Sequence, residues 1–212
     1  MYIHYFIIIN NYKKTLMHLI AHRINTIKHL KKINPNYGVE VDIRDDGNNL
    51  IIVHDPFKKG EKLETFLKFY KHKILIANIK SERIEDKVIK ILKKFKIKNY
   101  FFLDSSFPKI IDLIKKKFNK IALRVSYYEN VSTAEKLKGK VKWIWYDSFF
   151  GLPKNFKELR YIKKKLNFKI CLVCPELHGI SLNHNLNSFK KLKKSKLIDA
   201  VCTKEKYFHK WL

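Results

Sequence analysis

The chain has 212 residues, 46% of them hydrophobic, which is enough apolar material to bury a sizeable core and excludes a disordered chain. Lys and Arg total 46 against 19 Asp and Glu, which gives a formal net charge of +27, and only five of the basic residues are Arg. Because nucleic-acid recognition favours the planar guanidinium of Arg and the Lys residues are not clustered, the charge alone does not favour a nucleic-acid-binding module. The positive field would still attract anionic substrates, and an anionic membrane surface is a further expected partner. No feature of the sequence indicates an obligate protein partner.

The apolar run within residues 1–9 is too short to span a bilayer, and no small-residue cleavage pattern follows it. We therefore expect a cytoplasmic protein. Cys171, Cys174 and Cys202 are an odd number of cysteines, which argues against a disulfide framework. Cys171 and Cys174 form a C-x-x-C within an apolar run that reads as a strand, where residues three apart face opposite sides, so this pair is not interpreted as a redox or zinc motif.

Short β-rich runs and Lys-rich amphipathic stretches alternate along the chain. The strand-like runs are 16–21, 38–43, 50–54, 74–79, 100–103, 121–125, 142–146, 169–173 and 200–202. The stretches with apolar residues at helical spacing are 84–95, 109–118, 154–166 and 186–194. This alternation predicts an α/β protein with a parallel sheet covered by helices.

Nine strand-like runs are one more than a barrel of eight strands and eight helices requires. Residues 39–43 and 50–54 are separated only by the turn-like segment 45–49, so one of these two runs is expected to be a hairpin arm or an accessory strand. We predict a compact (β/α)₈ TIM barrel over residues 17–212 as a single domain. An open doubly wound sheet is the alternative, weakened because the chain has only six glycines and neither of the Gly-rich phosphate loops of that class.

Polar and charged residues fall at the ends of these predicted strands. They are His22, Arg23, Glu40, Asp42, His54, Asp55, Asn78, Lys80, Asp104, Arg124, Asp147, Glu176, His178, Thr203 and Lys204. In a barrel, the carboxyl ends of all strands meet at one mouth, where barrel enzymes place their chemistry.

Glu40 and Asp42 are two residues apart on one strand and therefore share a face. Carboxylates inside an apolar strand cost free energy unless they are paired or bind a metal. Their oxygen ligands favour Mg²⁺ or Ca²⁺ over zinc. Asp104, Arg124 and Asp147 read equally well as ion pairs lining the mouth and as substrate contacts, and Arg124 and Glu176 are taken as candidate substrate-binding residues.

The segments "LIAHR" at 19–23 and "GVEVDIRDDGNNLIIVHDPF" at 38–57 resemble the glycerophosphodiester phosphodiesterase superfamily, whose signature is H-R, then E-x-D, then H-D at the mouth of a TIM barrel. The later segments "NIKSE", "FFLDSSFP", "WIWYDSF" and "CPELHG" look like a less characterised branch, often found in bacterial surface-polysaccharide gene clusters.

The resemblance implies a role for each matching residue. His22 and His54 would be the general acid and base, and Glu40 and Asp42 would hold a divalent cation. Arg23 and Lys80 would hold the phosphate of a small anionic phosphodiester. An internal hydroxyl of the substrate commonly attacks first in this family, giving a cyclic phosphate that water then opens.

The sequence departs from the family pattern after the first predicted strand and at the end of the fourth. The family's third metal carboxylate lies in an I-E-I-K strand, and here the segment reads Ala77-Asn78-Ile79-Lys80, so Asn78 offers an amide oxygen instead. Ile24 replaces the glycine that usually follows H-R, and the P-E-N-T segment is reduced to Asn25-Thr26. Because family members commonly begin a residue or two before the "LIAHR" strand, Met17 is a candidate start, and residues 1–16 would then be a dispensable or non-native extension.

These observations favour a metal-dependent phosphodiester hydrolase that uses His22 and His54. The alternative is a catalytically weak or inactive barrel that binds a phosphate or sugar phosphate, motivated by Asn78 and the shortened loops.

Overall fold

The computed structural model describes residues 17–212, so the extension predicted at residues 1–16 lies outside the described residues. Ten strands are formed within this part of the chain. They are β1 (His18–Ala21), β2 (Gly38–Asp46), β3 (Asn49–Ile52), β4 (Glu61–Lys62), β5 (Leu75–Ile79), β6 (Tyr100–Leu103), β7 (Ala122–Val125), β8 (Trp143–Tyr146), β9 (Lys169–Val173) and β10 (Ala200–Thr203).

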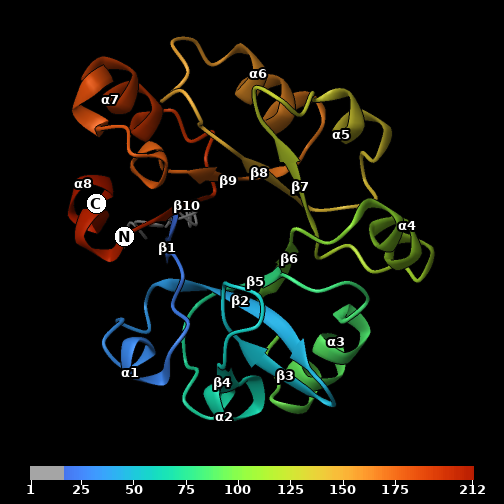
Figure 1. The fold of residues 1–212 in the computed structure, drawn as a ribbon. Helices are drawn as coiled ribbons and strands as arrows, with labels where there is room; N and C mark the ends of the chain where they lie inside the picture. The colour runs from blue at the N-terminus through green and yellow to red at the C-terminus, as the bar shows by residue number, and fades with distance from the viewer. Residues whose placement is uncertain (1–16) are drawn as a thin grey trace, which may run out of the picture.

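Eight of these strands follow one another in chain order around a ring. Parallel ladders join β6, β5, β2, β1, β10, β9, β8 and β7 in that order. Between β6 and β7 the ladder is reduced to an isolated parallel bridge between Phe102 and Ile121, where the Phe102 N–H donates to Lys120 O at 2.9 Å. Figure 1 shows the helices around the outside of the strands, also in chain order. The predicted (β/α)₈ barrel is confirmed, and the open doubly wound alternative is wrong because the strand order never reverses.

The extra strand signal comes from a hairpin attached to β2. Strand β3 runs antiparallel to β2, with Asp46 opposite Asn49, and β4 runs antiparallel to β3. The run at 50–54 is therefore the hairpin arm. The Val53 N–H donates to Asp42 O at 2.9 Å, which brings the following residue, His54, to the level of Asp42.

Strand side chains alternate between the barrel interior and the layer under the helices. The interior cluster is Ile20, Ile74, Ile76, Phe101, Leu103, Ala122, Trp143, Trp145, Cys171, Val173, Ala200 and Cys202. Phe101 stacks on Trp143 with ring centroids 4.5 Å apart, so aromatic rings fill much of the space that β-branched residues fill in other barrels. Cys171 lies in this interior, whereas Cys174 belongs to the outer layer, as expected for residues three apart on a strand.

The eight α-helices of the described residues are α1 (Ile27–Leu30), α2 (Leu63–Leu67), α3 (Glu85–Lys94), α4 (Phe107–Lys115), α5 (Ser132–Lys136), α6 (Lys157–Arg160), α7 (Leu186–Lys194) and α8 (Phe208–Trp211). The shorter helical turns are η1 (Tyr161–Lys165), η2 (Pro175–His178), η3 (Leu182–Asn185) and η4 (Glu205–Tyr207). Helix α3 buries Val88 and Leu92 and carries acids in its first turn and lysines in its last, which complements the helix dipole. Among residues 17–212, no helix has both the length and the apolarity needed to cross a bilayer.

His72 should make the fold sensitive to acid. Burial lowers the pKa of His72 from 6.5, and its Nε2 lies 3.0 Å from Ile33 O. The unfolded chain therefore takes up this proton first, and the contribution of His72 to stability is present above about pH 6.5 and is lost as the pH falls towards its lowered folded pKa. We expect His72→Gln to flatten the dependence of the unfolding free energy on pH between 7 and 5, measured by urea denaturation, whereas His209→Gln at an exposed site should leave that slope unchanged. Equal slopes for His72→Gln and wild type would contradict this assignment.

Candidate active site

The mouth of the barrel gathers the residues that the sequence placed at strand ends. His22 and Arg23 directly follow β1, while Glu40 and Asp42 lie on β2. Asn78, on β5, pairs with Asp42 in the parallel ladder, so their side chains share the barrel face that also carries Glu40. The structure thus brings residues from three neighbouring strands to one place.

Glu40 is fully buried at the centre of this group. Its Oε2 accepts the Arg23 N–H at 2.6 Å, its Oε1 accepts Asn78 Nδ2 at 2.9 Å, and His22 Nε2 lies 3.9 Å from Oε2. Burial, followed by the neighbouring Asp42 carboxylate, raises the pKa of Glu40. Arg23 has a left-handed backbone with φ 54°, and this conformation aims its N–H at the carboxylate.

Asp42 is also fully buried and is held by a residue that we did not predict as part of the site. Asn25 Nδ2 donates to Asp42 Oδ2 at 2.7 Å, and the Asp42 N–H donates to Asn25 Oδ1 at 2.9 Å. Lys80 Nζ lies 3.7 Å from Asp42 Oδ1. The only sequence signal for Asn25 was its position in the short segment after the H-R motif.

The donor set fits a hard divalent cation. Asp42 Oδ1 and Asn78 Oδ1 are buried oxygens that accept no hydrogen bond from the described residues, and they lie beside the Glu40 carboxylate. Carboxylate and amide oxygens are the ligands that Mg²⁺ and Ca²⁺ prefer. Within residues 17–212 no three His, Cys, Asp or Glu side chains gather in a metal-binding arrangement, in keeping with an amide where the family pattern has a third acid.

Both histidines of the motif lie close to the charge of Arg23. Burial, then the positive charges of Arg23 and Lys204, lowers the pKa of His22 to about 3, so its ring is neutral at pH 7. The Arg23 guanidinium lies 2.6 Å from His54 Nε2, and Asp55 Oδ1 lies 2.7 Å from His54 Nδ1. Because a guanidinium can only donate, the hydrogen-bond pattern assigns the proton to Nδ1 and leaves Nε2 as the acceptor that faces the mouth.

Arg124 is the centre of an ion-pair network on the other side of the mouth. It donates to Asp104 and to Asp147, and its Nε lies 3.7 Å from Glu129. Lys80 Nζ donates to Asp104 at 3.1 Å, and His178 is paired with Asp147. The network continues from Lys80 beside Asp42 to His178, so the structure places the Arg124 side chain in ion pairs lining the mouth.

Glu176 is buried and engaged with its neighbours. Its Oε1 accepts Thr203 Oγ1 at 2.5 Å and the Lys204 N–H at 3.0 Å, which ties η2 to the end of β10. Its Oε2 is buried and accepts no hydrogen bond from the described residues. Substrate contact by Glu176 therefore stays a prediction.

The sequence matches no family model and no curated protein. Solved structures share its fold, and two of them are phosphodiesterases. The glycerophosphodiester phosphodiesterase from Agrobacterium tumefaciens aligns with a TM-score of 0.65 and 12% identity, covering 92% of this chain and 99% of that one. The glycerophosphoryl diester phosphodiesterase from Parabacteroides distasonis aligns with a TM-score of 0.61 and 11% identity, covering 92% of this chain and 85% of that one. The chain has the glycerophosphodiester phosphodiesterase fold.

Within this fold, Asn78→Asp should strengthen divalent-cation binding. A third carboxylate beside Glu40 and Asp42 adds negative charge to the donor set, and we expect the affinity for Mg²⁺ or Ca²⁺ to rise about tenfold. Calorimetric titration and the increase in melting temperature on adding metal would both report this change. Asn48→Asp, in the exposed turn between β2 and β3, is the matched control and should leave metal affinity unchanged. An unchanged affinity in Asn78→Asp would place the cation site elsewhere.

Proposed function

We propose that this chain is a metal-dependent phosphodiester hydrolase acting on a small anionic diester. The observation that carries the proposal is the arrangement at the mouth. Two histidines, Arg23 and Lys80 surround two buried carboxylates, and Asp42 Oδ1 and Asn78 Oδ1 accept no hydrogen bond from the described residues. Cleaving a phosphodiester requires charge neutralisation of the phosphoryl oxygens, a base for the attacking hydroxyl and an acid for the leaving alcohol. The fold of the two solved phosphodiesterases supports the same reaction class.

Glu40, Asp42 and Asn78 would hold the cation. A divalent ion there would supply Lewis-acid neutralisation of the phosphoryl oxygens, and both Mg²⁺ and Ca²⁺ suit these ligands. Arg23 and Lys80 would bind the remaining phosphate oxygens, the first through its fork of donors and the second as a point charge. Lys80 is suited to this role because Asp42 and Asp104 fix its ammonium from two sides.

His54 would act as the general base. Asp55 orients its ring through Nδ1, and Nε2 has a lone pair on the side of the mouth, at present occupied by Arg23. When Arg23 turns to a bound phosphate, Nε2 becomes free to take the proton of the attacking hydroxyl as its oxygen forms the new bond to phosphorus. His22 is neutral in the free protein, so to act as the general acid it would first take up a proton when the anionic phosphate binds beside it. It would then deliver that proton to the oxygen of the leaving alcohol as that P–O bond breaks.

A binding barrel without turnover is the second candidate. It is favoured by Asn78, which stands where the family pattern has an acid. It is also favoured by the contact between Arg23 and His54, because in the free protein Arg23 occupies the Nε2 lone pair with which His54 would accept a proton. Such a protein would bind phosphate monoesters and diesters at Arg23 and Lys80 and release them unchanged.

Hydrolysis assays separate the two candidates. We expect wild type to cleave bis(p-nitrophenyl) phosphate or a glycerophosphodiester in Mg²⁺ or Ca²⁺, and to lose this activity in EDTA. Glu40→Gln should lose activity at every metal concentration, whereas Glu64→Gln on the surface of α2 should retain it. Absence of turnover on all diesters with both metals, together with measurable binding of a phosphate monoester, would select the binding barrel.

A further inference from the structure

Large exposed hydrophobic side chains are concentrated around the mouth. Nine such residues occur in the described part of the chain, and five of them follow strands at the mouth end of the barrel: Phe57, Phe107, Tyr127, Tyr128 and Phe150. Phe57 is 105% exposed, Tyr127 78%, Tyr128 70% and Phe150 67%. Scattered single residues of this kind need no explanation, but a concentration on one face is typical of an interaction surface.

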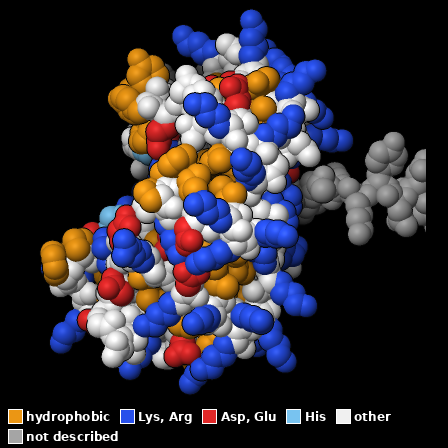
Figure 2. Space-filling model, turned by 90° about the vertical axis from the view of Figure 1, so that its right-hand side faces the viewer, with side chains coloured by type: hydrophobic (Ala, Val, Ile, Leu, Met, Phe, Trp, Pro, Cys, Tyr) orange, Lys and Arg blue, Asp and Glu red, His pale blue; other side chains and the backbone are white. Residues whose placement is uncertain are grey.

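Four of these five residues form two aromatic tips on opposite sides of the site. The first tip is Phe57, three residues after His54 in the segment between β3 and β4. The second tip comprises Tyr127 and Tyr128 after β7 and Phe150 after β8, where Tyr127 contacts Phe150 with ring centroids 5.0 Å apart. Figure 2 shows hydrophobic side chains on two projections at the left-hand edge of the molecule, with a hollow between them.

The second tip is connected to the site beneath it. Phe149 contacts both Tyr128 and His178, with ring centroids 5.7 and 4.6 Å apart, and His178 is paired with Asp147. A cavity of about 440 Å³ is lined by the tip and by Asp147. This cavity leads from the aromatic surface towards the ion-pair network of the mouth.

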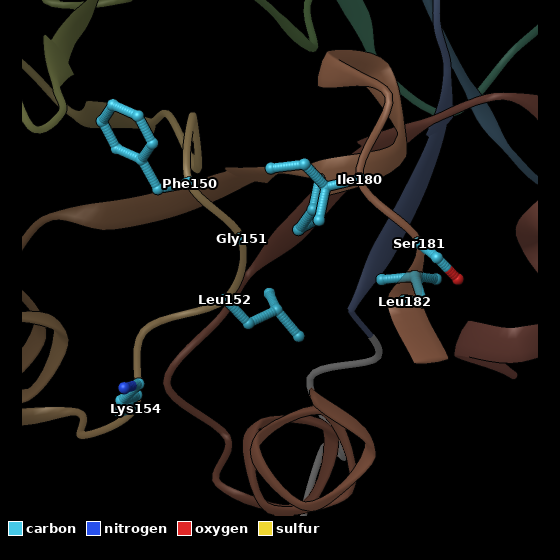
Figure 3. A pocket seen from close by; sticks show the side chains of 8 residues that line it. Phe150, Gly151, Leu152, Lys154, Ile180, Ser181 and Leu182 are labelled. Atoms are coloured by element: carbon cyan, nitrogen blue, oxygen red, sulfur yellow. The ribbon is translucent and has the colours of Figure 1, made fainter. Parts of the chain in front are cut away.

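The loop of the second tip is anchored while its aromatic ring is presented outwards. Leu152 is buried and, with Phe150, Ile180 and Leu182, lines a neighbouring pocket of about 220 Å³. Figure 3 shows the ring of Phe150 turned away from Leu152 and Ile180. The loop therefore has its own apolar anchor, and the exposure of Phe150 is not required to hold it in place.

Lysines flank both tips. Lys58 and Lys59 follow Phe57 and are exposed, and the exposed Lys154 lies four residues after Phe150. Aromatic side chains partition into the interface of a bilayer, and each nearby Lys adds electrostatic attraction to anionic lipid. A chain with a net charge of +27 has the complementary sign for such a surface.

We propose that the two aromatic tips dock the mouth of the barrel onto an anionic lipid bilayer, so that the phosphodiester entering the site is one carried by a membrane lipid. The docking surface is Phe57 to Lys59 on one side and Tyr127, Tyr128, Phe150 and Lys154 on the other. The second half of this inference, the lipid substrate, rests on the proposed function.

Co-sedimentation with vesicles tests the docking surface. The vesicles consist of phosphatidylcholine alone or of equal parts phosphatidylcholine and phosphatidylglycerol, and the protein is the full chain. We expect wild type to bind the anionic vesicles, and Phe57→Ser combined with Tyr127→Ser to reduce binding about tenfold or more. Phe69→Ser combined with Tyr161→Ser removes exposed aromatic residues on segments leading to the opposite end of the barrel and should change binding less than about twofold.

The outcomes for docking and for catalysis are distinguishable. Binding that is absent, or that falls equally in both double variants, overturns the docking surface even if wild type cleaves soluble diesters. Loss of binding confined to the tip variant, with its turnover of bis(p-nitrophenyl) phosphate equal to wild type, supports docking. If the protein binds anionic vesicles through the tips but hydrolyses no diester, the proposal of membrane docking is supported and the proposal of a lipid substrate is contradicted.

Discussion

Replacing His54 with Asn is expected to lower kcat for phosphodiester hydrolysis by about 100- to 10,000-fold, the usual contribution of a positioned general base. The structural reason is that Asp55 and Arg23 hold the two ring nitrogens of His54 in a defined orientation at the mouth. Asn keeps some polarity but cannot take up a proton. Steady-state kinetics on bis(p-nitrophenyl) phosphate would measure the change, and we expect KM to change much less than kcat because Arg23 and Lys80 remain to bind the phosphate.

Two matched variants sharpen this prediction. Asp55→Asn should lower kcat less than His54→Asn does, because it removes the carboxylate that orients the His54 ring and leaves the ring itself. His29→Asn, at an exposed position on α1, should leave kcat unchanged. A His54→Asn enzyme with kcat within about twofold of wild type would show that another group accepts the proton.

Arg124→Met should lower the free energy of unfolding by about 3–5 kcal/mol, the range for breaking a buried ion pair from one side. Asp147 is 5% exposed, and loss of the guanidinium leaves its carboxylate with His178 as its only ion-pair partner among the described residues. Asp104 would lose one of its two cations and keep Lys80. Urea denaturation would measure the loss, and Arg160→Met at an exposed site on α6 should change stability by less than about 0.5 kcal/mol.

A second substitution tests the cause of this loss. If the cost comes from an uncompensated buried charge, Asp147→Asn in the Arg124→Met background should recover part of it, because the remaining amide needs no counter-charge. If the loss of unfolding free energy in the double variant equals the sum of the losses in the two single variants, the two side chains act independently, and an uncompensated charge is not the cause.

Much of the barrel could be predicted from the sequence because its strands and longer helices have clear periodicity. The runs that became β5, β6, β8 and β9 are almost continuously apolar, as strands buried on both faces must be. By contrast, β4 has two residues and α1 has four, so neither is long enough to show a period. Their positions depend on packing against the rest of the chain.

The candidate site divides in the same way. Glu40 and Asp42 could be singled out because charged residues inside an apolar strand are costly, and His54 because it ends a strand run beside an acid. The contact between Asn25 and Asp42 joins a loop to a strand 17 residues later, and no local pattern predicts it. The ion pairs of Arg124 likewise connect the ends of three strands. The sequence could not decide whether these residues form ion pairs or bind substrate, because that depends on how the strands are placed in the barrel.

Time-resolved ³¹P NMR of glycerophosphocholine and bis(p-nitrophenyl) phosphate, with Mg²⁺ or Ca²⁺, tests the central claim most directly. In the presence of wild type, the diester resonance of at least one compound should be replaced by that of a cyclic phosphate or a monoester. The spectrum should stay unchanged with the His22→Asn/His54→Asn double variant, prepared in the same way. No change with wild type under either metal, or equal conversion by the double variant, would contradict a phosphodiesterase site at this mouth.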